Sequence, residues 1–427
     1  MERERKNSLK KEYLLIVLCC LVYSFVYAGR YGYNASITSV IDYYGVTRAD
    51  AGLVSTFFFF AYGAGQFLHA VFCRFYPPKY VIPAVLLASS GLNLALFFLP
   101  PFPAIKFLWM ANGILQSALW PMLVLILSRN LSAKMMSRAV MAMSLPVLLG
   151  TFLAYGSAAL FSRVGYFRGT FLVGTVLTAL IGLIWFFSYS SLTSVTAPRT
   201  VSDEVPDGEK EKRRRRAVGG ALIALFAVCA VFAIVDNFVK DGLNTWTPVI
   251  LKEQFGVGDS VSILMTLVLP VFGVFGSVLT VQMNRVIRDF RALAGVLYLG
   301  LCLCIAGLTL SMRQNSIALF LVCQGIISCL AHGINNVVTS VMPFALREKV
   351  NSGFLAGMMN ASCYIGSTAS AYGLGKVADG AGWDVVVRVL LIASVGATVL
   401  AGVTVTASVI RARTAKKDLP AGETKEA

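Results

Sequence analysis

The chain has 427 residues, of which 57% are hydrophobic and 14% are charged, and its mean hydropathy is +0.73. This composition excludes a soluble globular domain and indicates a helical protein that crosses the membrane many times. The formal net charge of +16 could indicate a nucleic-acid partner. The basic residues gather in alternate loops, however, as they do on the cytoplasmic side of membrane proteins. We therefore expect a lipid bilayer and no nucleic acid as partner.

Twelve apolar segments are long enough to cross about 30 Å of hydrocarbon, which takes roughly 20 residues each. Their expected limits are 13–41, 51–73, 80–99, 105–128, 139–162, 169–190, 217–250, 261–283, 292–311, 316–346, 354–376 and 387–410. An even number of spans puts both termini on one side, and the basic loops predict that this side is cytoplasmic. The expected location is the plasma (cytoplasmic, or cell inner) membrane.

The spans divide into two halves of similar length. The expected parts are a cytoplasmic N-terminus at 1–12, a six-helix bundle at 13–190, a basic cytoplasmic linker at 191–216, a second six-helix bundle at 217–410 and a cytoplasmic tail at 411–427. We interpret the basic run in the linker as a tether that fixes topology rather than a nuclear-localisation signal. We expect a monomer, because one chain supplies both halves.

A single cation lies inside the first span. Arg30 has apolar sequence on both sides, and a charge at bilayer depth costs about 2.5–3.5 kcal/mol on insertion scales, which indicates a functional site. At 3.6 residues per turn, Tyr23, Tyr27 and Asn34 fall on the same helical face as Arg30. We predict that this face binds the substrate.

The seventh span repeats the pattern of the first. Residues 240–244 read Lys-Asp-Gly-Leu-Asn, and residues 30–34 read Arg-Tyr-Gly-Tyr-Asn. Both fit [Arg/Lys]-x-Gly-x-Asn, which makes Lys240 and Asn244 candidate site residues, and Asn237 stands where a tyrosine stands in the first copy. A cation in the first helix of each half predicts a duplicated transporter with one site between the halves.

Asp236, Asp241 and His332 are further ionisable residues within the apolar spans. Asp236, one turn before Lys240, either neutralises that lysine or titrates as a coupling site for protons or cations. His332, in the tenth span, is either a hydrogen-bond partner between helices or a proton relay. We expect Asp241 near the outer mouth of the site.

Enzymatic chemistry has no support in the sequence. There is no P-loop motif, and no group of His, Cys, Asp and Glu has metal-ligand spacing. The nine cysteines lie in or beside apolar spans, where they are expected to be small core residues. We predict no enzyme activity, no metal and no cofactor.

Five motifs carry a family resemblance. They are Tyr23-x3-Tyr27-x2-Arg30, Gln116-x3-Trp120-Pro121, Lys240-x-Gly242 followed by Trp246-x-Pro248-x2-Leu251-Lys252-Glu253, Tyr364-Ile365-Gly366-Ser367, and Gly382-Trp383-Asp384. With six plus six spans and a basic central linker, the chain resembles the major facilitator superfamily. Within it, these motifs are similar to those of the organophosphate/inorganic phosphate antiporters, such as the glycerol-3-phosphate and hexose-phosphate transporters.

The resemblance implies the chemistry of the site. In that family two arginines, one in each half, hold the phosphate at the bilayer midplane. The first corresponds to Arg30, whereas Lys240 replaces the second, and lysine lacks the planar fork of arginine. Tyr31, Gln66 and Leu149 replace further basic groups of the family. The resemblance therefore implies an anion of lower charge than an organophosphate, in a pocket that Gln116 and Trp120 also line.

Three functions remain open from the sequence. The first is a secondary active transporter that moves a small organic anion by alternating access, foremost a phosphorylated metabolite in exchange for phosphate. The second is a proton-coupled symporter of a carboxylate such as a sugar acid, with Asp236 titrating. The third is a transporter-like membrane sensor, because Arg74 and Arg285 stand where the superfamily carries the acids of its cytoplasmic latch.

Overall fold

A computed structural model describes residues 2–193, 220–346 and 352–417, and nearly all of this part of the chain is helical, without a strand. The first half contains α1 (Glu2–Ala35), α2 (Ile37–Tyr44), α3 (Arg48–Phe72), the short η1 (Cys73–Phe75), α4 (Pro78–Phe97), α5 (Phe102–Ser117), α6 (Leu119–Asn130), α7 (Ala133–Ala142), α8 (Pro146–Arg163) and α9 (Gly169–Thr193). The second half contains α11 (Gly220–Phe255), α12 (Asp259–Met265), α13 (Val268–Val286), α14 (Phe290–Arg313), α15 (Ile317–Asn336), the π-helical η2 (Val337–Val341), α16 (Met342–Ala345), α17 (Ser352–Ala381) and α18 (Trp383–Lys417). Most of the predicted linker, and the end of the predicted tail, lie outside the described residues.

The structure confirms an all-α membrane fold. In the described residues, 11 helical segments are long and apolar enough to cross a membrane. The predicted span 354–376 is not among them, although it lies within α17, which has 30 residues. Its many Gly, Ser and Ala residues lower its hydropathy, and it packs between α3 and α11 inside the bundle. With α17 included, the helices agree with the twelve predicted spans.

Several predicted spans are broken into two helices, and proline explains some of these breaks. Proline removes a backbone donor and clashes with the carbonyl four residues earlier. Pro121 accounts for the break at Ala118 between α5 and α6, and Pro146 for the end of α7 at Ala142. The π-helical turn η2 likewise ends two residues before Pro343. These breaks were not predicted from hydrophobicity, which does not distinguish a kinked span from a straight one.

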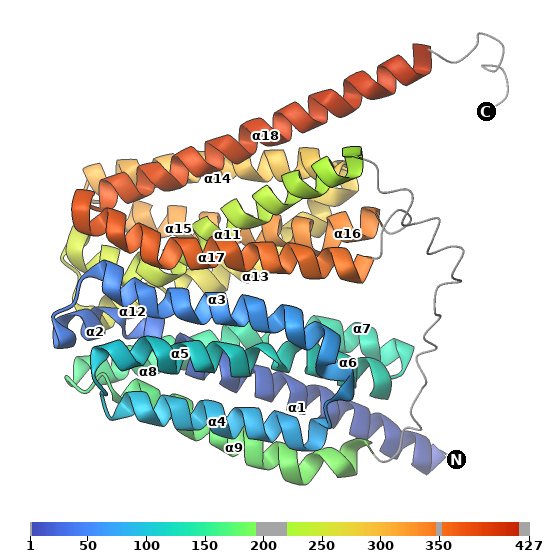
Figure 1. Ribbon diagram of the computed structural model, residues 1–427, viewed down its shortest axis with the longest axis vertical. Helices are drawn as coiled ribbons and strands as arrows, with labels where there is room; N and C mark the ends of the chain where they lie inside the picture. The colour runs from blue at the N-terminus through green and yellow to red at the C-terminus, as the bar shows by residue number, and fades with distance from the viewer. Residues whose placement is uncertain (1, 194–219, 347–351, 418–427) are drawn as a thin grey trace.

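The two halves pack one above the other in Figure 1, with α3 and α17 at their junction. Glycines permit the closest approaches. A Cβ atom at Gly52 would overlap the carbonyl oxygen of Ala371 in α17, and one at Gly366 would overlap the carbonyl oxygen of Ile234 in α11. Small residues at such contacts allow helix backbones to pack tightly in a membrane. The chain thus brings α3, α17 and α11 into a central row.

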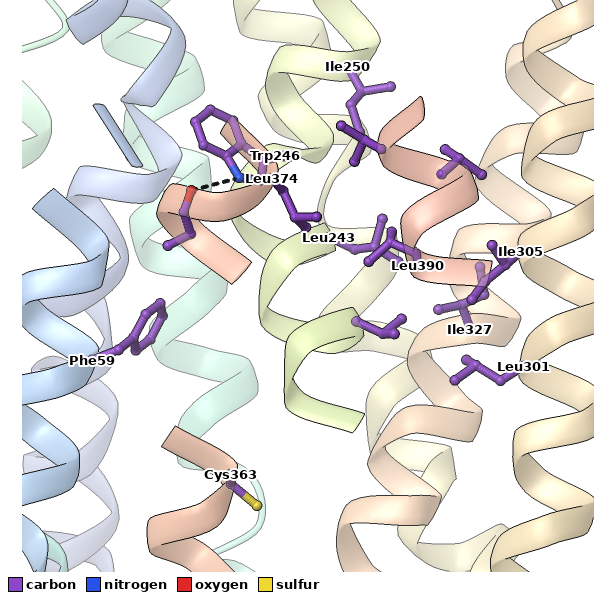
Figure 2. Packing of buried hydrophobic residues seen from close by; sticks show 14 of the residues in the cluster. Phe59, Leu243, Trp246, Ile250, Leu301, Ile305, Ile327, Cys363, Leu374 and Leu390 are labelled. Carbon is purple, nitrogen blue, oxygen red and sulfur yellow. Dashed lines mark hydrogen bonds between the residues drawn. The ribbon is translucent and has the colours of Figure 1, made fainter. Parts of the chain in front are cut away.

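A buried apolar cluster anchors α11. Figure 2 shows Leu243, Trp246 and Ile250 of α11 among aliphatic side chains of the second half. The indole nitrogen of Trp246 donates a hydrogen bond to the carbonyl oxygen of Ala371 at 3.2 Å. This packing fixes the position of the helix that carries Lys240.

The first described helix begins, and the last described helix ends, at the same end of the bundle. The start of α1 and the end of α18 lie on one side of Figure 1, and α2 and α12 lie at the opposite end. We call the end that contains α2 and α12 the distal end. The arrangement agrees with an even number of spans.

Candidate functional site

Arg30 of α1 is the centre of a buried polar cluster. Its residue surface is 7% exposed, and its Nε donates a hydrogen bond to Oε1 of Gln116 at 3.1 Å. The guanidinium carbon lies 4.1 Å from the ring centroid of Tyr62, 4.6 Å from that of Tyr27 and 5.3 Å from that of Phe58. Nη2 is buried without a hydrogen-bond partner, and Arg30 is in none of the ion pairs among the described residues. Aromatic rings stabilise this cation, and the N–H donors of Nη2 stay unused.

Gln116 is held in a fixed orientation toward Arg30. Its Nε2 donates to Oγ of Ser89 at 3.0 Å and to Oδ1 of Asn112 at 3.1 Å, and Ser89 Oγ donates to Asn112 Oδ1 at 2.7 Å. All three residues are fully buried. The amide nitrogen must therefore face these oxygens, so the amide oxygen faces the guanidinium. The motif predicted Gln116, but Ser89 lies in a span without any motif and was missed.

The predicted aromatic residues lie beside Arg30. The ring of Tyr23 is 5.0 Å from that of Tyr27 and 4.9 Å from that of Trp120. Sequence reasoning missed Tyr62 of α3 as a site residue, although its ring is 5.0 Å from that of Tyr364 in α17. The Tyr62–Tyr364 contact joins the two halves next to the cation. Tyr62 could not be singled out in advance, because one tyrosine in an aromatic span is usually a packing residue.

Lys240 of α11 faces the same region from the second half. It interacts electrostatically with Asp241, Asp236 and, across the halves, Tyr27. It is half-buried and forms no ion pair with a described residue. Asp241 accepts a hydrogen bond from the hydroxyl of Ser367 in α17. The expectation that Asp241 lies near the outer mouth is wrong, because it lies near the middle of the α11 span, beside Lys240.

Asp236 has an unusual environment. It is 0% exposed, and neither of its carboxyl oxygens has a hydrogen-bond partner of regular geometry. The side-chain amide of Asn335 in α15 lies beside this carboxyl group as a hydrogen-bonding neighbour. The simple ion pair with Lys240 that the sequence allowed is not formed among the described residues. A buried carboxyl group without a cation paired to it is strongly disfavoured in its charged form, so Asp236 remains available for another role.

Asn34 and Asn244 lie where the halves meet. The amide nitrogen of Asn34 donates to Oγ1 of Thr245 at 3.2 Å, and its amide oxygen accepts from Ser55 at 2.8 Å. The backbone carbonyl of Asn244 accepts a hydrogen bond from the hydroxyl of Tyr155 at 3.1 Å. The structure thus gives Asn34 partners within the protein on both its polar atoms.

Two other predicted polar residues are bonded within their own helices. The side-chain amide of Asn237 donates to the carbonyl of Ala233 at 3.2 Å. Nδ1 of His332 lies 2.8 Å from the carbonyl oxygen of Ser328, and its ring packs against Gly273 of α13. The structure therefore favours the structural interpretation of His332. Among the described residues no group of three His, Cys, Asp or Glu side chains is placed to hold a metal ion.

Ion pairs join the halves at the distal end. Nη2 of Arg48 in α3 is 2.7 Å from Oε2 of Glu253 in α11, and its Nη1 is 3.1 Å from Oδ1 of Asp379 in α17. Lys252 of α11 pairs with Asp42 of α2. We call these five residues the distal ion-pair network. The sequence did not predict the network, which holds the distal end closed in this conformation.

Comparisons with known proteins agree with this architecture. The family model of the Major Facilitator Superfamily matches residues 19–371. A bacterial homolog to the human lysosomal transporter Spinster, in an inward-facing and occupied conformation, has a TM-score of 0.72 at 14% identity, covering 92% of this chain and 96% of that one. A nucleoside transporter has a TM-score of 0.70 at 11% identity, covering 91% and 99%. A D-xylose-proton symporter has a TM-score of 0.69 at 13% identity, covering 92% and 97%. No curated protein sequence matches the chain. At these identities the likeness concerns the fold alone.

Proposed function

Because the chain belongs to the Major Facilitator Superfamily, we propose that it is a secondary active transporter that carries a small, singly charged organic anion by alternating access. The observation that supports this most is Arg30, a buried cation between the halves whose Nη2 group is unbonded and which pairs with no carboxylate among the described residues. Lys240 provides a second cation from the other half.

The unused donor of Arg30 explains why an anion would bind there. A buried donor without a partner destabilises a protein by about 1–3 kcal/mol, and by more when the group is charged. A carboxylate or phosphate oxygen at Nη2 would recover this energy and neutralise the charge. Since Gln116 is already fully bonded, it positions the guanidinium and leaves this donor for the substrate.

The number of charges argues for one negative group on the substrate. Lys240 has two carboxyl groups nearby, Asp236 and Asp241, whereas Arg30 has none paired with it. The second half therefore adds little net positive charge to the site. A phosphorylated metabolite exchanged for phosphate, which the family resemblance implies, remains the second form of substrate and is included in the test.

Alternating access requires the distal end to open. The distal ion-pair network and the Asn34–Thr245 hydrogen bond join the two halves, so both must break when one half rocks against the other. Without a substrate, Arg30 is an uncompensated charge between the halves. A bound anion neutralises this charge and so lowers the barrier to the rocking motion.

The test is uptake into proteoliposomes of three radiolabelled probes: benzoate, glucuronate, and phosphate against a phosphate-preloaded interior. We expect uptake of at least one, lost in Arg30→Ala and retained in Arg168→Ala. Arg168 is a matched control because it also stacks on an aromatic ring, that of Tyr166 at 4.6 Å, but lies in an exposed loop. Uptake by Arg30→Ala at the wild-type rate, or no uptake of any probe by folded protein, contradicts the proposal.

A specific observation supports proton coupling as a second candidate mechanism. Asp236 is a fully buried carboxyl group, one turn from Lys240, that forms no ion pair with a described residue. Such groups in membrane transporters mark proton pathways. We expect uptake of a carboxylate to rise with an inward proton gradient, and this dependence to disappear in Asp236→Asn. An unchanged gradient dependence in that variant rules out Asp236 as the coupling group.

A further inference from the structure

A continuous series of aromatic rings runs beside Arg30. The ring centroids of Trp120 and Tyr23 are 4.9 Å apart, those of Tyr23 and Tyr27 5.0 Å, those of Tyr27 and Tyr31 5.4 Å, and those of Tyr31 and Tyr155 6.3 Å. Tyr23, Tyr27 and Tyr31 are four residues apart and so share one face of α1. Trp120 of α6 and Tyr155 of α8 extend the series at its two ends. We call these five residues the aromatic ladder.

Two rings of the aromatic ladder are partly exposed toward the second half. Tyr27 and Tyr31 are only half-buried although they lie inside a membrane span. Tyr27 interacts electrostatically with Lys240, and Tyr31 with Asp241, both of α11. The exposed parts of these rings therefore face the region between the halves rather than lipid. A substrate held by the cations meets aromatic surface on one side.

The surroundings of Arg30 determine how an anion can approach it. The rings of Tyr27 and Tyr62 lie over the guanidinium, and Nε is bonded to Gln116. The orphaned Nη2 lies on the edge of the guanidinium plane. An anionic group must therefore bind edge-on, in the plane of the guanidinium, as a carboxylate does. The remainder of such a molecule then lies along the neighbouring rings of the aromatic ladder.

Three amide side chains that could bind the hydroxyl groups of a sugar already form hydrogen bonds within the protein. Both polar atoms of the Asn34 side chain are bonded within the protein, and so are those of Gln116. The amide nitrogen of Asn237 is bonded to its own helix. A polyhydroxylated substrate needs many such partners, whereas a flat ring needs an aromatic surface.

We propose that the substrate of this site is an aromatic carboxylate, with its carboxylate on Arg30 and its ring stacked on the aromatic ladder at Tyr27 and Tyr31. This inference rests on the proposed anion transport and names the chemical class of its substrate. Offset or edge-to-face ring contacts add affinity beyond the area they bury. An aromatic ring should therefore bind more tightly than a saturated ring of the same size.

The experiment compares three carboxylates by isothermal titration calorimetry on the purified full-length chain in detergent. Benzoate and cyclohexanecarboxylate have the same charge and nearly the same size, and glucuronate represents a sugar acid. We expect benzoate to bind about 2- to 12-fold more tightly than cyclohexanecarboxylate for each ring that it stacks on. Arg30→Ala should abolish binding of benzoate.

Variants at Tyr27 test the role of the ladder itself. Tyr27→Leu should reduce the preference for benzoate over cyclohexanecarboxylate, and Tyr27→Phe should keep it, because the ring rather than the hydroxyl group makes the contact. Tyr80→Leu is the control, since Tyr80 is an exposed tyrosine on α4 at a distance from the site. Thermal unfolding of each variant shows whether it is folded.

Three outcomes overturn the inference. Equal affinity for benzoate and cyclohexanecarboxylate, or tighter binding of glucuronate, removes the aromatic preference while leaving anion transport in place. Absence of binding by all three carboxylates to folded protein also overturns it. Anion transport is in that case judged separately by the uptake of labelled phosphate and its loss in Arg30→Ala.

Discussion

Loss of the Arg48 side chain should make the distal end open more often. Arg48 belongs to the first half and pairs with Glu253 and Asp379 of the second. Arg48→Ala removes both ion pairs without adding bulk. It leaves intact the hydrogen bonds that the backbone N–H groups of Arg48 and Ala49 donate to Asp379 at 3.1 and 2.8 Å. The variant therefore weakens the closure without abolishing it.

The expected magnitude follows from the exposure of the ion pairs. The side chains of Arg48, Glu253 and Asp379 are 29%, 29% and 24% exposed, so water screens them substantially. A partly exposed ion pair contributes about 0.2–1 kcal/mol, and two pairs about 0.4–2 kcal/mol. The equilibrium between open and closed distal ends should shift about 2- to 30-fold toward the open form. Asp379→Ala removes one of the two ion pairs together with both backbone hydrogen bonds. It should give a larger shift, because each of these hydrogen bonds contributes about 0.5–1.5 kcal/mol.

The assay uses a reporter just inside the distal end. Thr245 is 0% exposed and hydrogen-bonded to Asn34 across the halves, so a thiol placed there by Thr245→Cys should react with a water-soluble maleimide only when this end opens. The labelling rate is measured in detergent with and without Arg48→Ala. The nine native cysteines could also react with the maleimide. The labelling rate of the protein that keeps Thr245 is therefore measured in the same way and subtracted.

The control is Arg163→Ala, which removes an exposed arginine at the end of α8 that is in none of the described ion pairs. It should leave the labelling rate unchanged. A labelling rate in Arg48→Ala equal to that of the parent protein would show that the distal ion-pair network does not limit opening, and the proposed gating argument would be wrong.

Three further outcomes are expected. Gly366→Ala should lower the free energy of unfolding by roughly 1–3 kcal/mol, because its Cβ overlaps a carbonyl of α11. Gly373→Ala, with nothing within 4 Å, should not lower it, and equal thermal unfolding of the two would contradict this. His332→Gln should keep any proton dependence of transport. It should lower the free energy of unfolding by about 0.5–1.5 kcal/mol, the net contribution of one hydrogen bond. Loss of the proton dependence would instead support the interpretation of His332 as a proton relay. Burial opposes ionisation of Asp289, but hydrogen bonds from Arg291 outweigh it and lower the pKa below its ordinary 3.8. The ionised carboxylate of Asp289 therefore contributes its full share to the free energy of unfolding above pH 3.8, and this share is lost as the pH falls through the lower pKa of the folded state. The melting temperatures of wild type and Asp289→Asn should accordingly converge only at strongly acidic pH.

The sequence alone determined the membrane fold and the position of one cation. Hydrophobicity acts locally along the chain, so the spans could be located without tertiary information. Among the predicted spans, the one within the small-residue helix α17 is not apolar enough to be identified as membrane-spanning in the described residues. Arg30 stood out because a charge in an apolar span has few structural uses. The superfamily is confirmed by the match to residues 19–371, whereas the resemblance to organophosphate antiporters remains a prediction.

The tertiary structure decided which residues surround that cation. Gln116 was predicted as a site residue from its motif, but Tyr62 was not, and no sequence pattern showed that Asp236 forms no ion pair with Lys240. The distal ion-pair network was equally hidden, since Arg48 meets acids 205 and 331 residues away in the chain. Such contacts depend on how each helix is rotated and shifted against its neighbours. A local sequence pattern predicts which residues share one face of a helix. Only the packing of the folded chain determines which neighbouring helix that face contacts.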